Sequence, residues 1–169
     1  FDMVKTAVGS CQSRRGLVAD AENLPIATDS VDTVYSNMAI QWCTDYRMLF
    51  KELKRIIRPG GRLYFTTLLD GTLKELSQSW ERVDNQAHVN PCIALSALEA
   101  AIAGAGFKSV TLEHRQHVIR YEKALALLKD LKGIGANYVV GHRGNQFVGK
   151  HKFKKMLNTY DELHRQNST

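Results

Sequence analysis

The side chains with the most chemical potential lie at residues 37–42, where a strand-like run ends in small and polar residues. Asn37 can offer an amide group, and Ala39 leaves room for a ligand. Gln41 and Trp42 could form one wall of a substrate cavity. A tryptophan packed beneath a helix is an equally good interpretation, because a buried indole is common. The run therefore indicates either a ligand site or a packed turn.

An acidic residue, Asp20, follows the short apolar run at residues 16–19 and stands between two alanines. A carboxylate at a strand end suits hydrogen bonding to an amine or a ribose. The backbone N–H of Ala21 could bond an adenine ring. An exposed aspartate that caps a turn is the simpler alternative, and Asp20 taken alone favours it.

A third candidate is Lys132, which opens the glycine-containing segment at residues 132–135. Two glycines let a loop approach a ligand closely, and the lysine could face a carboxylate. A dinucleotide-binding loop is not favoured, because the segment follows a helix instead of a strand and lacks a third glycine. A helix end with a nearby cation is the physical interpretation.

Metal and nucleophile chemistry find no support. The six histidines show no metal-ligand spacing, and neither a GxSxG motif nor a Cys–His pair is evident. Cys11, Cys43 and Cys92 are far apart and form no CxxC motif, which favours reduced thiols in a cytoplasm over disulfides or zinc. The sequence predicts no metal site and identifies no catalytic residue.

The elements that would position these residues form a strand–helix–strand unit. Residues 31–37 are strand-like, residues 46–57 carry the apolar pattern of an amphipathic helix, and a second strand at 61–67 follows Pro59 and Gly60. This order is typical of a βαβ unit in an open parallel sheet, with the two strands adjacent. Ligands bind at the carboxyl ends of such strands, so we expect the candidates near residues 20 and 37 to converge on one cleft there.

Other elements follow from hydrophobic periodicity. Further strands are predicted at residues 16–19 and 107–120. Helices are predicted at residues 3–10 (a helix tail), 73–83, 97–103, 121–131 and 152–165. Residues 137–149 are predicted to form a loop.

Composition sets wider limits. The 169 residues are 44% hydrophobic and 24% charged, which is ordinary for one globular domain with a sizeable core. No apolar run approaches the roughly 18 residues of a membrane span, and no signal-peptide pattern opens the chain. We therefore expect a cytoplasmic protein without a membrane partner.

Positive charge gathers late in this chain of net charge +6, at Arg143, Lys150, Lys152, Lys154 and Lys155. An acidic carrier protein or a carboxylate substrate would complement such charge. Nucleic acid is not expected, because helix-turn-helix, RNP and zinc-finger patterns are missing. A solvated helix face explains the same lysines equally well.

Together the segments resemble class I S-adenosylmethionine-dependent methyltransferases. That resemblance is carried by residues 20–25, 30–32 and 53–61. Three further segments, in order and spacing, are similar to one group in that family, the malonyl-[acyl-carrier protein] O-methyltransferases of early biotin synthesis. They are residues 36–43, residues 65–68 together with 71–76, and residues 131–136, and the resemblance runs through nearly the whole chain.

The resemblance implies an α/β, Rossmann-like sheet with helices on both faces. Residues 1–169 would form a single partial domain, with helical substrate-side insertions at about 70–100 and 122–165. S-adenosyl-L-methionine would be the cofactor. The candidates for binding the cofactor are Asp20, Ala21, Asn37 and Ala39. The candidates for binding substrate are Gln41, Trp42 and Lys132.

The implied reaction moves a methyl group from S-adenosylmethionine to the free carboxylate of malonyl-acyl carrier protein or malonyl-CoA. Masking that charge would make the acyl chain acceptable to fatty-acid elongation enzymes, which would build a pimeloyl precursor. A carboxylate is already nucleophilic and a sulfonium already leaves well, so catalysis would be mostly positioning and desolvation. Two alternatives stay open: methylation of another small molecule such as a quinone precursor, or a non-catalytic truncated fold that binds a carrier protein.

The sequence departs from the family at both ends. The glycine loop after the family's first strand, the acidic residue ending the second strand, and the last strand have no counterpart. The first, second and seventh strands would then be missing, which leaves gaps beside the third and sixth. We expect a piece of a longer protein, or one with segments left out, that binds the cofactor weakly or not at all by itself.

Overall fold

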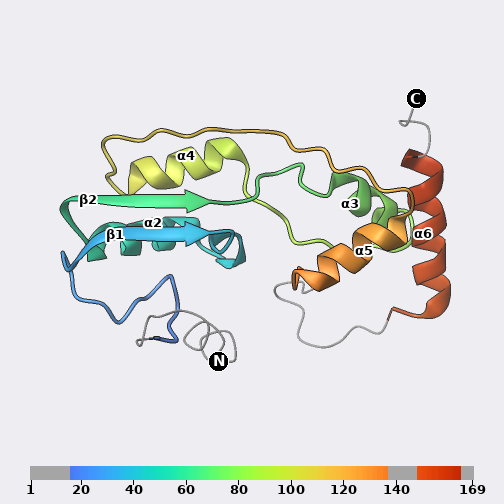
Figure 1. Ribbon diagram of the computed structural model, residues 1–169, viewed down its shortest axis with the longest axis horizontal. Coiled ribbons are helices and arrows are strands. Elements are labelled where there is room, and N and C mark those ends of the chain that lie inside the picture. Colours follow the sequence, from blue (N-terminus) through green and yellow to red (C-terminus); the bar gives the residue numbers. More distant parts are fainter. Residues whose placement is uncertain (1–15, 137–147, 165–169) are drawn as a thin grey trace. The chain divides into compact units, whose positions relative to one another are not determined.

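The computed structural model describes residues 16–136 and 148–164 (Figure 1). Its elements, in chain order, are β1 (Val31–Asn37), the 3-10 helix η1 (Ile40–Trp42), α2 (Tyr46–Ile56), β2 (Ile57–Thr66), α3 (Lys74–Glu81), α4 (Leu95–Gly104), α5 (Ala124–Gly133) and α6 (Lys150–His164). The predicted helix tail at residues 3–10, Cys11, Arg143 and most of the predicted loop at 137–149 lie outside the described residues.

The chain divides into two compact units. Unit 1 comprises Phe1–Leu68 and Ile93–Val110, and unit 2 comprises Leu69–Cys92 and Thr111–Thr169. Unit 1 holds the strands with α2 and α4, and unit 2 holds α3, α5 and α6.

Strands β1 and β2 are adjacent and parallel, as the strand–helix–strand pattern predicts. Asn37 at the end of β1 is in register with Thr66 at the end of β2. Near the start of the pair the register is irregular, and β2 approaches β1 closely at Gly61. A Cβ atom there would lie 2.7 Å from the carbonyl oxygen of Asp32 and 2.7 Å from the side chain of Ile57, so only glycine fits.

Helix α2 covers one face of the strand pair. Its N-terminus is capped by Asp45, whose carboxylate accepts hydrogen bonds from the backbone N–H groups of Arg47 and Met48. Its inward side chain Phe50 is fully buried and meets Phe65 of β2 edge-on, with ring centroids 5.5 Å apart. Helix α4 packs against α2. The core of unit 1 therefore lies on this side of the strands.

The strands predicted at residues 16–19 and 107–120 are wrong. Both segments lack regular secondary structure, and the sheet of the described chain has two strands. An extended segment becomes a strand only when a neighbour pairs with its backbone N–H and C=O groups. Residues 107–120 have no such neighbour in the described structure, and Val118 and Ile119 are largely exposed.

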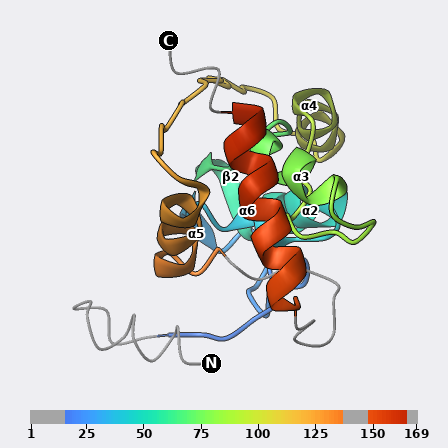
Figure 2. The same cartoon turned by 90° about the vertical axis from the view of Figure 1, so that its right-hand side faces the viewer.

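Unit 2 is a helical group closed around Leu76, Trp80 and Met156. Figure 2 shows α6 running between α3 and α5, and both contact it. The helices predicted at residues 73–83 and 152–165 are confirmed as α3 and α6. The side chains packed around the centre are Leu73, Val83, Val89, Leu128, Leu131, Val148, Phe153, Leu157 and Tyr160. Within the described ranges, no helix is both long enough and apolar enough to cross a membrane.

Candidate functional site

The carboxyl ends of β1 and β2 are tied together by Thr66. Its hydroxyl donates a hydrogen bond to the amide oxygen of Asn37, and it accepts from the backbone N–H of Met38 at 3.1 Å. Met38 takes the left-handed conformation, with φ of +49°, which is uncommon for a residue other than glycine. The amide oxygen of Asn37 is thus engaged, and its exposed side chain offers N–H groups to a ligand.

Helix η1 carries the next candidates. The side-chain nitrogen of Gln41 donates to the carbonyl oxygen of Met38 at 2.7 Å. Its amide oxygen is buried and has no hydrogen-bond partner among the described residues. Ala39 is exposed, and Trp42 is 37% exposed, while Ile40 supplies the buried side chain of this turn. The indole of Trp42 is therefore not packed away beneath a helix.

Thr67 is a residue that the sequence reasoning missed. It follows the end of β2 directly, and its hydroxyl is buried without a hydrogen-bond partner in the described structure. Unpartnered buried polar atoms are uncommon, and a bound ligand is one explanation. Its place after a parallel strand was a signal that could have identified it, since Asn37 was identified on the same ground.

Asp20 caps a turn, as the simpler of its two interpretations predicts. Its carboxylate accepts from the backbone N–H of Glu22 at 2.9 Å, and its carbonyl oxygen accepts from the N–H of Asn23 at 3.1 Å. The side chain is exposed, and Ala21 beside it is half-buried. This geometry fixes the turn and leaves the Asp20 carboxylate facing solvent.

Glu22 is a second residue that the sequence reasoning missed. It joins this turn to the segment after η1. Its carboxylate accepts from the backbone N–H groups of Thr44, at 2.6 Å, and Asp45, at 2.9 Å. Burial raises the pKa of the Cys43 thiol, and the nearby negative charges of Glu22 and Asp20 raise it further. The structure thus brings the turn at Asp20 beside the residues that follow β1.

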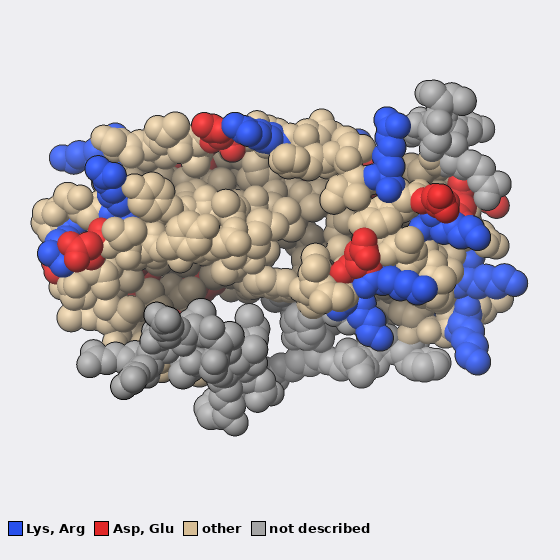
Figure 3. All heavy atoms as spheres, in the orientation of Figure 1, with Lys and Arg blue, Asp and Glu red and all other residues tan. Residues whose placement is uncertain are grey.

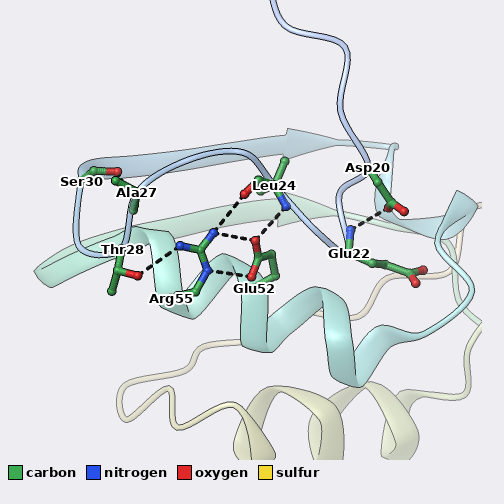
Figure 4. A network of polar contacts seen from close by, with 8 residues as sticks. All are labelled: Asp20, Glu22, Leu24, Ala27, Thr28, Ser30, Glu52 and Arg55. Atoms are coloured by element: carbon green, nitrogen blue, oxygen red, sulfur yellow. Dashed lines mark hydrogen bonds and ion pairs between the residues drawn. The ribbon is translucent and has the colours of Figure 1, made fainter.

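A second carboxylate holds the next part of this loop against α2 (Figure 4). Glu52 accepts from the backbone N–H of Leu24 at 2.7 Å and forms a two-pronged ion pair with Arg55 at 2.6 and 2.8 Å. The guanidinium of Arg55 also donates to Leu24 and Thr28, each at 3.1 Å. The hydrogen bond from Arg55 lowers the pKa of Glu52. These contacts hold Leu24 and Thr28 against the C-terminal part of α2, and Figure 4 shows Thr28 near the start of the strands, whereas Asp20 lies toward their carboxyl ends.

Lys132 belongs to unit 2, whereas the strand ends belong to unit 1. It lies exposed in the last turn of α5. The N–H groups of Ile134, Gly135 and Ala136 bond back to carbonyl oxygens of the helix, and Gly135 has φ of +75°. This is a helix C-terminal cap, as the sequence interpretation holds. Among the described residues, no three His, Cys, Asp or Glu side chains are placed to hold a metal ion.

Comparison with known proteins agrees with this architecture. The family model described as a methyltransferase domain matches residues 1–65. The strand–helix–strand unit and these matches identify the chain as a member of the methyltransferase family, with an α/β Rossmann-like fold.

Within that family, the chain is similar to proteins named malonyl-[acyl-carrier protein] O-methyltransferase. It is 37% identical to the one from Methylococcus capsulatus over 87% of this chain and 54% of that protein. It is 40% identical to the one from Hahella chejuensis over 86% of this chain and 52% of that protein. A Haloferax volcanii methyltransferase solved with the Trm112 activator matches 62% of this chain and 46% of that one, at TM-score 0.49 and 26% identity. The chain thus spans about half the length of the curated relatives it matches.

Proposed function

We propose that this chain is part of an S-adenosylmethionine-dependent O-methyltransferase that methylates the free carboxylate of malonyl-acyl carrier protein or malonyl-CoA. The observation that carries the proposal is 40% identity, over 86% of the chain, to a protein named for that reaction. The tied strand ends at Asn37 and Thr66 support it, because ligands of open parallel sheets bind at this edge.

The residues present fit S-adenosylmethionine. The cofactor carries an amine on its adenine, hydroxyls on its ribose and an ammonium on its methionine part. Exposed Asp20 offers acceptors for such donors, and exposed Asn37 offers N–H groups to the cofactor's carboxylate. Exposed Ala39 leaves the approach open, and Ala21 presents a backbone N–H. Polar groups of both kinds are therefore available for binding the cofactor.

The substrate side needs positioning more than acid–base chemistry. S-adenosylmethionine supplies a methyl group on a good leaving group, and the substrate carboxylate is the nucleophile. The amide oxygen of Gln41 can only accept, so it suits an N–H donor such as the amides of a pantetheine arm. Trp42 would cover the reacting groups from water. We assign Lys132 the role of attracting the carboxylate.

The experiment uses this chain joined to the part of the Hahella chejuensis relative that the match does not cover. Asp20→Ala should weaken S-adenosylmethionine binding by about 1–3 kcal/mol in calorimetry, the usual cost of leaving a partner unsatisfied. Asp20→Asn, which keeps an oxygen to cap the turn, separates folding from binding. An unchanged affinity in both variants removes Asp20 from the site. Cofactor binding without methylation of a malonyl thioester would point instead to another small-molecule substrate.

For the carrier protein, we propose α6 as the docking face. Figure 3 shows Lys and Arg side chains gathered on the part of unit 2 that contains α6, where Lys150, Lys154 and Lys155 are exposed. Lys152 is partly neutralised, because its ammonium donates to Asp84 at 2.9 Å. Acyl carrier proteins are acidic, and opposed surface charge mainly raises the association rate. We place this encounter in the cytoplasm.

Reversing the charge of Lys154 and Lys155 to Glu in the joined protein should lower kcat/KM for carrier-bound substrate. The apparent KM of the unchanged protein should rise steeply with ionic strength, because salt screens exposed charges. Activity on a small malonyl thioester should change little and serves as the control. Equal losses on both substrates would show that these lysines do not select the carrier.

A further inference from the structure

Two adjacent threonines stand at the end of β2, and their hydroxyls are in opposite states. The hydroxyl of Thr66 donates a hydrogen bond to the amide oxygen of Asn37 and accepts one from the backbone N–H of Met38. The hydroxyl of Thr67 is buried and has no hydrogen-bond partner among the described residues. Leaving a buried hydroxyl unpartnered costs stability, because it has given up its hydrogen bonds to water. A partner from outside the described residues would remove that cost.

The side chain of Gln41 in η1 is in a similar state, and its orientation is fixed. Its nitrogen donates to the carbonyl oxygen of Met38 at 2.7 Å. A carbonyl oxygen only accepts, so turning the amide around would lose this hydrogen bond. The amide oxygen of Gln41 is therefore held away from Met38, where it is buried without a partner in the part of the chain that the structure describes.

Met38 links the two oxygens to the same end of the strand pair. Its carbonyl oxygen holds Gln41, and its N–H bonds to both the carbonyl and the hydroxyl oxygen of Thr66, the neighbour of Thr67. Within the described ranges, three buried side-chain N or O atoms lack a partner, and the third belongs to His164 in unit 2. Both such atoms of unit 1 are thus attached to the carboxyl end of its parallel strands, where ligands of open sheets bind.

The two oxygens are complementary to one chemical group. The amide oxygen of Gln41 can only accept a hydrogen bond, whereas the hydroxyl of Thr67 can donate one. A secondary amide supplies both counterparts, an N–H for Gln41 and a carbonyl oxygen for Thr67. The malonyl group itself offers only acceptors. The pantetheine arm, which both acyl carrier protein and coenzyme A use to carry such a group, contains secondary amides.

We propose that Thr67 and Gln41 recognise an amide of the pantetheine arm, with the Thr67 hydroxyl donating to its carbonyl oxygen and Gln41 accepting from its N–H. Both residues are half-buried as a whole, whereas Met38 and Trp42, which flank this turn, are exposed. Movement of an exposed side chain would admit the arm. This inference rests on the proposed function and adds a specificity to it, because a site built to bond an amide rejects a thioester that lacks one.

The test uses the joined protein and two malonyl thioesters, one of N-acetylcysteamine, which keeps an amide of the arm, and one of ethanethiol, which has none. Thr67→Val keeps the shape of the side chain and removes the hydroxyl. It should raise KM for the amide-bearing thioester about two- to tenfold, the usual worth of one hydrogen bond, and leave the ethyl thioester unchanged. Thr67→Ser keeps the hydroxyl and should retain both activities. Thr33→Val, the same change at an exposed strand position, is the matched control and should alter neither.

Stability gives a readout that a merely structural role would move in the opposite direction. Without substrate, Thr67→Val should leave the melting temperature of the joined protein unchanged or higher, because an apolar group replaces an unpartnered polar one. A lower melting temperature would overturn the proposal, since the hydroxyl would then have a partner within the protein. Equal losses on the two thioesters would also overturn it. Weaker S-adenosylmethionine binding by Thr67→Val would assign the hydroxyl to the cofactor and overturn it as well.

Failure of the proposed function is a separate result. If the unchanged joined protein methylates neither thioester, the malonyl reaction is wrong, and calorimetry with pantetheine alone decides the amide site. Weaker pantetheine binding by Thr67→Val than by Thr33→Val would support the site. Equal binding by the two variants, or none by the unchanged protein, would overturn it.

Discussion

The two units bury their hydrophobic residues in different ways. In unit 2 three helices surround Trp80 and Met156, so the core is enclosed by side chains from elements of the same unit. In unit 1, α2 fills one side of the strand pair with Phe50, while Tyr35 and Tyr64 stay exposed on the other. A group of helices can satisfy its own backbone, but parallel strands need further strands and helices around them. We therefore expect unit 2 to be the more self-sufficient unit.

The largest effect should come from Phe50→Ala in unit 1. Removing a fully buried ring that touches Phe65 should cost about 3–5 kcal/mol of stability. Hydrogen exchange should accelerate in β1, β2 and α2, while α3 and α6 keep their protection. Equal acceleration in both units would show that they unfold together and would break the comparison.

Met156→Ala makes the corresponding change in unit 2. Met156 is fully buried, and the cavity should cost about 2–5 kcal/mol, seen as faster exchange in α3 and α6. Met48→Ala is the control, because Met48 on α2 is half exposed and its loss should change stability little. If unit 2 tolerated Met156→Ala as well as Met48→Ala, its core would not be closed as described.

Gly61→Ala tests the close approach within the strand pair. The new Cβ would press on the backbone of Asp32 and the side chain of Ile57, so we expect a loss of about 1–3 kcal/mol in a denaturant titration. Gly104→Ala, near the end of α4, meets no atom within 4 Å and should be neutral or stabilising by up to about 1 kcal/mol. Equal effects of the two substitutions would mean that the strands have room to separate.

The smallest effect concerns pH in unit 2. Hydrogen bonding from Lys152 and His88 lowers the pKa of Asp84 to about 2. A carboxyl whose pKa is lowered on folding stabilises the protein above its unfolded pKa of roughly 4, and this contribution is lost as pH falls toward 2. Asp84→Asn should cost about 1 kcal/mol at neutral pH and flatten the stability of α3 and α6 between about pH 4 and 2.

Glu52→Gln supplies the counterpart in unit 1, because the pKa of Glu52 is also lowered, by Arg55. Its effect on acid stability should appear in α2 and the strands and leave the slope of α3 and α6 intact. A slope that vanished from both units in either variant would contradict their separate description.

Local pattern was enough for much of the fold. The 31–37 strand and most of the 46–57 helix follow from the hydrophobic period, but the second strand begins at Ile57, ahead of Pro59 and Gly60, and not at residue 61 as the sequence predicts. The same kind of pattern predicted strands at residues 16–19 and 107–120, where the structure has none. Those segments have strand-like composition, but a strand forms only beside a neighbour that pairs with it, and neither segment has one among the described residues. Residues 31–37 and 61–67 are neighbours of each other, so they pair.

The candidate site, like the fold, was predicted from the sequence only in part. Residue type and position after a predicted strand selected Asn37, Ala39 and Asp20 as candidates, although the strand predicted ahead of Asp20 does not form. Only the tertiary structure could show that Glu22 bonds to Thr44 and Asp45, some twenty residues away, and so brings the turn at Asp20 beside η1. Whether Asp20 and Asn37 bind the cofactor stays a prediction.

The sequence was sufficient to predict the βαβ unit, the helices α3 and α6, and the family, because these depend on local periodicity and on motifs along the chain. Only the tertiary structure showed which extended segments become strands, and that the buried oxygens of Gln41 and Thr67 lack hydrogen-bond partners among the residues that the structure describes. Each of these depends on what surrounds a residue in space, and a backbone or side-chain group finds or lacks its partner only when distant parts of the chain meet.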